Sequence, residues 1–232
     1  MNFIDKIRFP NRNKKNEEYM HWLSSFKKKK LSILLKNIIN DKDKLSILVS
    51  NSFIHENGFY KITLFEDIEK DMFLRMHLWF PNDRGIYVGE SDIHDHTGKF
   101  ISYILTGRIK HQIYQMSNNK KTKYFKYDCY PLNDKKNILS YEEDIFMKCI
   151  NTEIFYKNEI YSFNSDIFHT VNPLDRIPTA TLCLRIGDKE IKNHTSVFKN
   201  KKNINSSKTP TLLSKIKVVK DLSYIITVIN NF

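Results

Sequence analysis

The stretch SDIHDHTG at residues 91–98 places two histidines, His94 and His96, one residue apart. On a β-strand, side chains at i and i+2 point to the same face, so both imidazoles can reach one metal ion. A third ligand then has to come from another strand, and the best candidate is His169, within FHTVN at residues 168–172. The alternative is that the pair belongs to an ordinary polar strand face. The three histidines are therefore a hypothesis about a metal site, and the rest of the chain has to support it.

Length and composition favour a single globular domain, with or without helical additions. The chain has 232 residues, of which 41% are hydrophobic and 28% charged, enough to form a sizeable core. Its three cysteines lack CxxC spacing and are odd in number, which predicts reduced thiols and a cytoplasmic location. No run of 18 apolar residues occurs, and residues 1–15 lack the apolar core of a secretory signal. The sequence therefore predicts no membrane span.

The net charge of +12 permits two interpretations. It can reflect solubility and a general richness in lysine, or it can mark a surface that binds polyanions. The lysines are scattered, with denser runs at 27–30, 120–126 and 199–202, and no nucleic-acid motif accompanies them. We therefore predict no nucleic-acid partner.

The chain begins with a helical pattern and then changes to short strands. Apolar residues recur at helical spacing over 19–26 and 31–38, and neither Gly nor Pro falls between Pro10 and Gly58. From Gly58 onward, strands are predicted at 59–65, 72–80, 100–105, 108–116, 123–130, 159–163, 167–171 and 179–186, and a turn is predicted at 81–85. An amphipathic helix is predicted again at 209–229, and we interpret it as covering the core. Many short strands separated by turns indicate an all-β sandwich or barrel.

The strand at 72–80 has two different faces. One face is wholly apolar, with Leu74, Met76 and Leu78, and the other carries Arg75 and His77. The sequence thus predicts a sheet that packs on one side and presents polar groups on the other.

At this point the chain resembles a known superfamily. With Gly89 ahead of the histidine pair and Gly107 after it, the first stretch resembles the first cupin motif, and FHTVN at 168–172 resembles the second. The fuller stretch 78–97 is similar to the cysteine dioxygenase branch. The resemblance implies an all-β core, the cupin double-stranded β-helix or jelly roll, with flanking α-helices at both ends. It divides the chain into a helical extension at 1–57 that packs on the barrel, a jelly-roll domain at 58–190, and a C-terminal extension at 191–232 that ends in the amphipathic helix.

The resemblance also bears on the metal. Most cupins carry a glutamate ligand four or five residues after the second histidine, where this chain has Phe100 and Ile101. A set of three neutral histidines leaves the 2+ charge uncompensated and about three positions open on an octahedral metal. Resemblance to the thiol dioxygenases favours Fe(II), although imidazole ligands also suit Zn, Ni and Cu, and Mn is a further alternative. Asp95, between two ligands, is expected to point away from the ion.

Several departures from that branch limit what can be transferred. Residues 99–101 offer no cysteine for the cysteine–tyrosine cross-link of animal cysteine dioxygenases. Where the family has Ser-x-His-x-Tyr, this chain has Thr181-x-Cys183-x-Arg185, and the family's carboxylate-binding arginine falls near Lys61. We therefore expect free cysteine to be a poor substrate, and no catalytic residue is assigned.

By resemblance, the face of the strand at 179–186 that carries Thr181, Cys183 and Arg185 is the interior one and supplies further candidates. The substrate-binding candidates are Lys61, Arg75, His77, Thr181, Cys183 and Arg185. We expect Arg75 and Arg185 to bind the far carboxylate of a ligand. The alternative is that each arginine pairs with a structural acid such as Glu90 or Asp92. The histidines expected at the surface or in structural roles are His21, His55, His111 and His194.

Three functions remain open. The first is a mononuclear non-haem iron dioxygenase or oxygenase that acts with dioxygen on a small anionic or thiol-containing metabolite. The second is a non-catalytic cupin that binds a metal or ligand. The third is a redox-neutral cupin isomerase or lyase that uses Zn, Ni or Mn.

Overall fold

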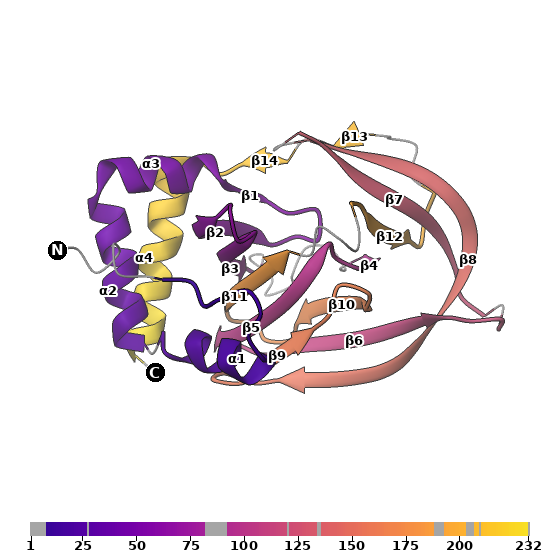
Figure 1. Ribbon diagram of the computed structural model, residues 1–232, viewed down its shortest axis with the longest axis horizontal. Coiled ribbons are helices and arrows are strands. Elements are labelled where there is room, and N and C mark those ends of the chain that lie inside the picture. The colour runs from indigo at the N-terminus through magenta and orange to yellow at the C-terminus, as the bar shows by residue number, and fades with distance from the viewer. Residues whose placement is uncertain are drawn as a thin grey trace.

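The computed structural model describes residues 8–26, 28–81, 92–119, 121–133, 136–187, 193–202, 207–208 and 210–231. Two antiparallel sheets form the core, and helices from both ends of the chain gather on one side of it (Figure 1). The helices are α1 (Asn16–Ser24), α2 (Lys28–Asn40), α3 (Lys42–Ser50) and α4 (Lys215–Asn231). Gly89, Glu90 and all but the first residue of the turn predicted at 81–85 lie outside the described residues.

The first sheet has the strand order β14-β1-β2-β3-β11-β5-β9. Its strands are β1 (Ser52–Ile54), β2 (Tyr60–Asp67), β3 (Met72–Trp79), β5 (Gly98–Thr106), β9 (Ile160–Phe163), β11 (Thr179–Gly187) and β14 (Thr211–Leu212). The pairing of β11 with β3 sets Thr181 opposite His77, and Cys183 opposite Arg75. Residues directly opposite each other on antiparallel strands share a face, so these four side chains belong to one side of the sheet.

The second sheet closes on itself. Its order is β13-β8-β6-β10-β4-β12-β7, with a further pairing of β7 to β8. The strands are β4 (Ile93–His94), β6 (Ile109–Met116), β7 (Lys123–Asn133), β8 (Lys136–Phe155), β10 (Phe168–Pro173), β12 (Thr195–Lys199) and β13 (Ser207–Lys208). Residues 136–146 of β8 pair with β7 and residues 147–155 pair with β6. The strongly curved β8 thereby joins the two ends of the sheet (Figure 1).

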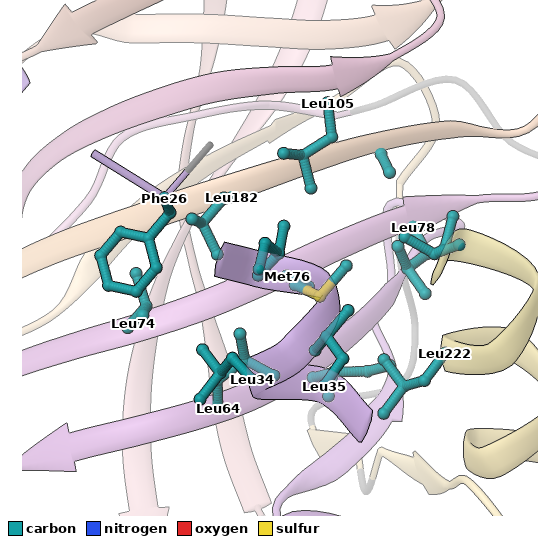
Figure 2. Packing of buried hydrophobic residues seen from close by; sticks show 14 of the residues in the cluster. Phe26, Leu34, Leu35, Leu64, Leu74, Met76, Leu78, Leu105, Leu182 and Leu222 are labelled. Atoms are coloured by element: carbon teal, nitrogen blue, oxygen red, sulfur yellow. The ribbon is translucent and has the colours of Figure 1, made fainter. Parts of the chain in front are cut away.

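The apolar face of the first sheet packs against the helices. Leu74, Met76 and Leu78 on β3 are at most 1% exposed. They belong to the same buried cluster as Leu35 of α2 and Leu222 of α4 (Figure 2). Burying a leucine or methionine side chain is worth roughly 1.5–3 kcal/mol, so this face anchors the helical layer. Because strand side chains alternate, the same packing turns the polar face of β3 toward the second sheet.

Local residues explain where the helices begin. Asp41 accepts hydrogen bonds from the backbone N–H groups of Asp43 and Lys44, both at 3.1 Å, and so caps the first turn of α3. Ser214 accepts the N–H of Lys217 at 3.2 Å and caps α4. That cap explains why α4 begins at Lys215, later than the predicted start at 209, while Thr211–Leu212 pairs with β1 as a strand.

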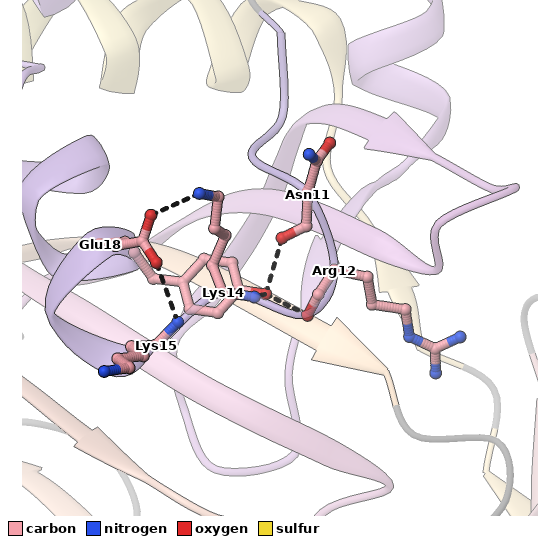
Figure 3. Close-up of polar contacts among 6 residues, drawn as sticks. Asn11, Arg12, Lys14, Lys15 and Glu18 are labelled. Atoms are coloured by element: carbon pink, nitrogen blue, oxygen red, sulfur yellow. Dashed lines mark hydrogen bonds and ion pairs between the residues drawn. The ribbon is translucent and has the colours of Figure 1, made fainter.

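Hydrogen bonds attach the N-terminal segment to the barrel before α1 begins. Figure 3 shows the contacts around Asn11, Arg12 and Glu18, among them a Lys14–Glu18 ion pair at 2.6 Å. The hydroxyl of Tyr19 donates to the carbonyls of Asn11 and Arg12. Arg12 in turn donates from Nη2 to the carbonyl of Gly187 at 2.9 Å. The segment is thereby joined to the end of β11.

The predicted jelly-roll core with helices at both ends is confirmed. The division at 1–57, 58–190 and 191–232 stays a prediction; β1, β12 and β13 lie outside 58–190 and pair with strands inside it. Strand β8 was not predicted from the sequence, because most of its side chains are exposed and show no regular alternation. No helix in the described part of the chain is long and apolar enough to cross a membrane.

Candidate metal centre

Two of the three histidines are cross-strand neighbours. The single register pair between β4 and β10 is His94 with His169. His96 lies two residues beyond the end of β4, in a loop rather than on the strand. The loop is fixed because the His96 N–H donates to the Ser165 carbonyl at 3.2 Å. The closure of the second sheet thus brings together the three residues that the sequence proposed as ligands.

The three imidazoles converge on one point. Each offers a ring nitrogen, and these nitrogens lie within 4.8 Å of one another. Nε2 of His96 lies 3.0 Å from Nε2 of His169. Two nitrogens bound at right angles to one ion, each at about 2.1 Å, are themselves about 3.0 Å apart. The spacing of this pair therefore fits two ligands of one metal ion.

The other ring nitrogens are engaged in ways that orient the rings. Nδ1 of His94 lies 2.7 Å from the carbonyl of Asp92, so it must carry the proton that this bond requires. Nδ1 of His169 lies 2.7 Å from Nε2 of His111. Both arrangements leave Nε2 available toward the common point, as is usual for metal-ligating histidines.

His111 was expected at the surface or in a structural role, and it lies directly behind the candidate ligand His169. It is 4% exposed and packs beside Phe155, Tyr161 and Phe163. The sequence contained one indication, since His111 alternates with Ile109 and so falls on an inward face of its strand.

The site favours neutral imidazoles. Burial lowers the pKa of His94, and it holds the pKa values of His96 and His169 well below the ordinary range. Burial is the largest cause in each case because a charged imidazole loses its hydration. Neutral rings keep the lone pair that a metal requires. The residues present therefore fit a metal ion with three imidazole ligands.

Three further residues shape the surroundings of the candidate ligands. The Asp95 carboxylate accepts the backbone N–H of Ser196 at 2.7 Å and is 2% exposed, which fixes the loop between two ligands. The Phe100 ring packs on His96 with centroids 4.1 Å apart. Phe163 packs on His169 at the same centroid distance. Phe100 thus contributes an apolar wall to the site.

The site opens into a cavity of about 640 Å³ between the two sheets. Of the predicted substrate-binding residues, Lys61, Arg75, His77 and Arg185 line it. Thr181 and Cys183 do not border it; they are at most 1% exposed. Burial raises the pKa of the Cys183 thiol to about 11, which makes it a poor nucleophile at neutral pH.

Three cations, Lys61, Arg75 and Arg185, line the cavity, and they differ in whether an acidic side chain neutralises their charge. Arg185 donates from Nη1 to the Asp71 carboxylate at 2.9 Å and from Nη2 to the Thr97 hydroxyl at 3.0 Å. The alternative that an arginine pairs with a structural acid therefore holds for Arg185, with Asp71 as the acid. Asp92, one of the acids proposed for that role, pairs with Lys199.

Arg75 and Lys61 are held by aromatic rings. The Arg75 guanidinium lies 4.6 Å from the centroid of Phe73, and its Nε is buried without a hydrogen-bond partner. Lys61 Nζ lies 4.7 Å from the centroid of Phe53. Burial, and next to it the charge of Arg185, lowers the pKa of Arg75 to about 10. Burial, with Arg75 next, holds the pKa of Lys61 well below its usual range. A cation–π contact is worth about 0.5–2 kcal/mol, less than the several kcal/mol that burying an ion costs.

An aromatic wall adjoins these cations and includes a histidine that the sequence did not place there. His55 lines the cavity and stacks on Phe59 with centroids 4.4 Å apart. Phe59 packs in turn on His77 at 4.7 Å. Of the other histidines, His21 is exposed, and His194 Nε2 lies 3.4 Å from the Asp128 carboxylate.

Comparisons with known proteins do not assign this chain to a family. No family model and no curated protein matches the sequence. Among solved structures, the cupin domain of Schizosaccharomyces pombe Cnp3 is 9% identical, with a TM-score of 0.35, over 56% of this chain and 61% of that one. A variant of oxalate decarboxylase from Bacillus subtilis is 11% identical, with a TM-score of 0.36, over 61% of this chain and 29% of that one. At these scores the likenesses carry no argument, and the fold is assigned from the strand pairing.

The described chain is therefore an antiparallel two-sheet jelly roll in which three histidines form a group that could hold a metal ion.

Proposed function

We propose that this protein is a mononuclear non-haem iron oxygenase of the cupin type, acting on a small anionic or thiol-containing metabolite. The observation that carries the proposal is that His94, His96 and His169 converge, and that His94 and His96 line a cavity that Lys61 and Arg75 also line. A binding group for a metal and a binding group for an anion in one cavity are what such a reaction requires.

The donor set favours an open coordination sphere. Three neutral imidazoles supply no negative charge and leave about three positions of an octahedral ion for other ligands. We propose Fe(II), with Zn, Ni or Mn as the alternatives. When bound, the metal would supply the redox chemistry and sites for substrate and dioxygen.

The residues of the chain would position the substrate and keep water away. We propose that Lys61, Arg75 and His77 contact the substrate directly. Arg185, engaged by Asp71, would act through Thr97, the residue after His96. Thr181 and Cys183, buried behind the cavity, would support the residues that line it. Phe100 and Phe163 would exclude water beside the ligands. We further propose that the protein acts in the cytoplasm, without nucleic acid or membrane as a partner.

Two other functions compete with this proposal. A redox-neutral isomerase or lyase would use the same three ligands with Zn, Ni or Mn, and a non-catalytic cupin would bind a metal or ligand without turnover. No described acidic side chain stands among the converging ring nitrogens, which favours a site that receives an anionic ligand.

The test begins with anaerobic metal analysis of the purified protein, followed by oxygen uptake after loading with Fe(II). We expect one iron per chain and oxygen uptake that depends on an added thiol or carboxylate substrate. Free cysteine should be turned over slowly compared with longer thiols or acids. Turnover without oxygen uptake would favour the isomerase or lyase, and bound metal without turnover of any of these compounds would favour the binding protein.

A further inference from the structure

We propose that Lys61 and Arg75 form a subsite for a second acidic group, so that the substrate is a small dianion such as a dicarboxylate. One acidic group would bind at the metal and the other at this pair. The inference rests on the proposed function and adds the class of metabolite that enters the cavity.

The two cations are placed to share one anion. Lys61 lies opposite His77, and Thr63 lies opposite Arg75. Lys61 and Arg75 are therefore diagonal neighbours on one face of β2 and β3, at a backbone separation of about 7–8 Å that long side chains readily span. Both line the same cavity as His94 and His96.

The acids around this part of the cavity are already engaged. Asp71 is paired with Arg185, Asp92 with Lys199, and Asp95 accepts the backbone N–H of Ser196. Glu56 also lines the cavity and has an interaction of its own. Among the described residues, the carboxylates of Asp71, Asp92 and Asp95 are thus not left to neutralise Lys61 or Arg75.

The contacts that Lys61 and Arg75 make leave hydrogen-bonding capacity unused. Lys61 and Arg75 each lie over a phenylalanine ring, and Nε of Arg75 is buried without a partner. Buried polar groups normally have hydrogen-bond partners. An acidic group bound here would supply an acceptor for these donors.

The charges that face Lys61 make an anion favourable. Arg75 and His77 face it from β3, Arg185 and Cys183 from β11, and His55 from the segment before β2. The pKa values of Lys61 and Arg75 are both lowered, with burial as the largest cause and a neighbouring arginine next. A bound carboxylate would reverse both effects, because an opposite charge nearby favours the charged form.

The candidate metal ligands themselves carry no negative charge, and Asp92 and Asp95 beside them are engaged elsewhere. The three ligands are imidazoles, and Phe100 packs beside them. With a divalent ion bound, the cavity of about 640 Å³ would thus have two positive ends. A monoanion would leave one end uncompensated, whereas a dianion satisfies both.

The test uses Zn²⁺-loaded full-length protein and isothermal calorimetry. The probes are malonate, succinate and glutarate, each compared with the monoacid of equal carbon number: propionate, butyrate and pentanoate. We expect at least one dicarboxylate to bind at least about tenfold tighter than its monoacid. Lys61→Met and Arg75→Met should reduce that ratio to about one, and Lys61→Arg should retain it. The matched controls Lys148→Met and Arg176→Met, at exposed positions, should leave it unchanged.

Two results would overturn the inference. One is a ratio near one for all three pairs in the wild type, and the other is an unchanged ratio in both the Lys61→Met and the Arg75→Met variant. Protein that binds zinc but shows no preference refutes the dianion while leaving the metal site intact. If the protein fails to bind zinc, the proposed function is refuted. Titration of the metal-free protein then still tests the subsite, because Lys61→Met and Arg75→Met should both lose binding of the acids.

Discussion

A hydrogen bond joins the rings of His111 and His169, with Nε2 of His111 2.7 Å from Nδ1 of His169. The opposite nitrogen of His169 faces His96 at 3.0 Å. The ring of His111 packs against the rings of Tyr161 and Phe163. A buried neutral ring thus fixes the orientation of a candidate metal ligand from behind.

Replacing His111 tests this relationship. We expect His111→Phe to weaken zinc binding by about 10- to 100-fold, because residues that orient metal ligands typically contribute that much. His111→Gln should weaken it less, since the amide oxygen can still accept the Nδ1–H of His169. Competition with a chelator measures both affinities, and His21→Phe, at an exposed position, is the control. Wild-type affinity in folded His111→Phe would contradict the assignment.

Removing the ligands themselves should separate metal binding from folding. His94→Ala, His96→Ala and His169→Ala should each lower the metal content sharply, because one of three donors is lost. The midpoint of thermal unfolding of the metal-free protein should change little, since the main apolar cluster lies on the other side of the first sheet. Metal content per chain and circular dichroism check the two statements. The assignment is wrong if the triple variant keeps full metal stoichiometry.

Replacing Arg185 should destabilise the protein, whereas replacing Arg75 should not. Arg185→Met leaves Asp71 without its partner, and the two side chains are only 14% and 10% exposed. Breaking such a pair from one side costs about 3–5 kcal/mol. Arg75→Met removes a half-buried cation that has no carboxylate partner among the described residues, so the free energy of unfolding should be unchanged or higher. Urea denaturation of both variants gives the comparison, and the reverse order would refute this account of the cavity.

Acid should destabilise the metal-free protein. Burial, with the charge of His94 next, lowers the pKa of His111 to about 4 from an ordinary value of 6.5. Between those pH values the unfolded chain binds a proton that the folded chain does not. The free energy of unfolding therefore falls as the pH falls, by up to about 1.4 kcal/mol per pH unit for one such group. His55 and His77 have pKa values lowered in the same direction, again mainly by burial. Unfolding measured between pH 7 and pH 4.5 should show the slope, and His111→Phe should reduce it. A stability that is flat across this range would contradict the prediction.

The sequence by itself determined the layers of the fold and the candidate ligand set. The alternation of Leu74, Met76 and Leu78 with Arg75 and His77 is a local property with a period of two, so both faces of β3 could be assigned without coordinates. The spacing of His94 and His96 is also local. The boundaries of α4 and the existence of β8 were not fixed in this way, because a cap at Ser214 and a strand exposed over most of its length leave weak periodic patterns.

Only the tertiary structure decided how the cations and the histidines of the site are partnered. Asp71 lies 114 residues from Arg185, and His111 lies 58 residues from His169. Partners so far apart in the chain meet through strand order and register, which no local pattern encodes. For the same reason the sequence could nominate Arg75 and Arg185 together, while only the folded chain shows that Asp71 neutralises Arg185 and that Arg75 has no described carboxylate partner.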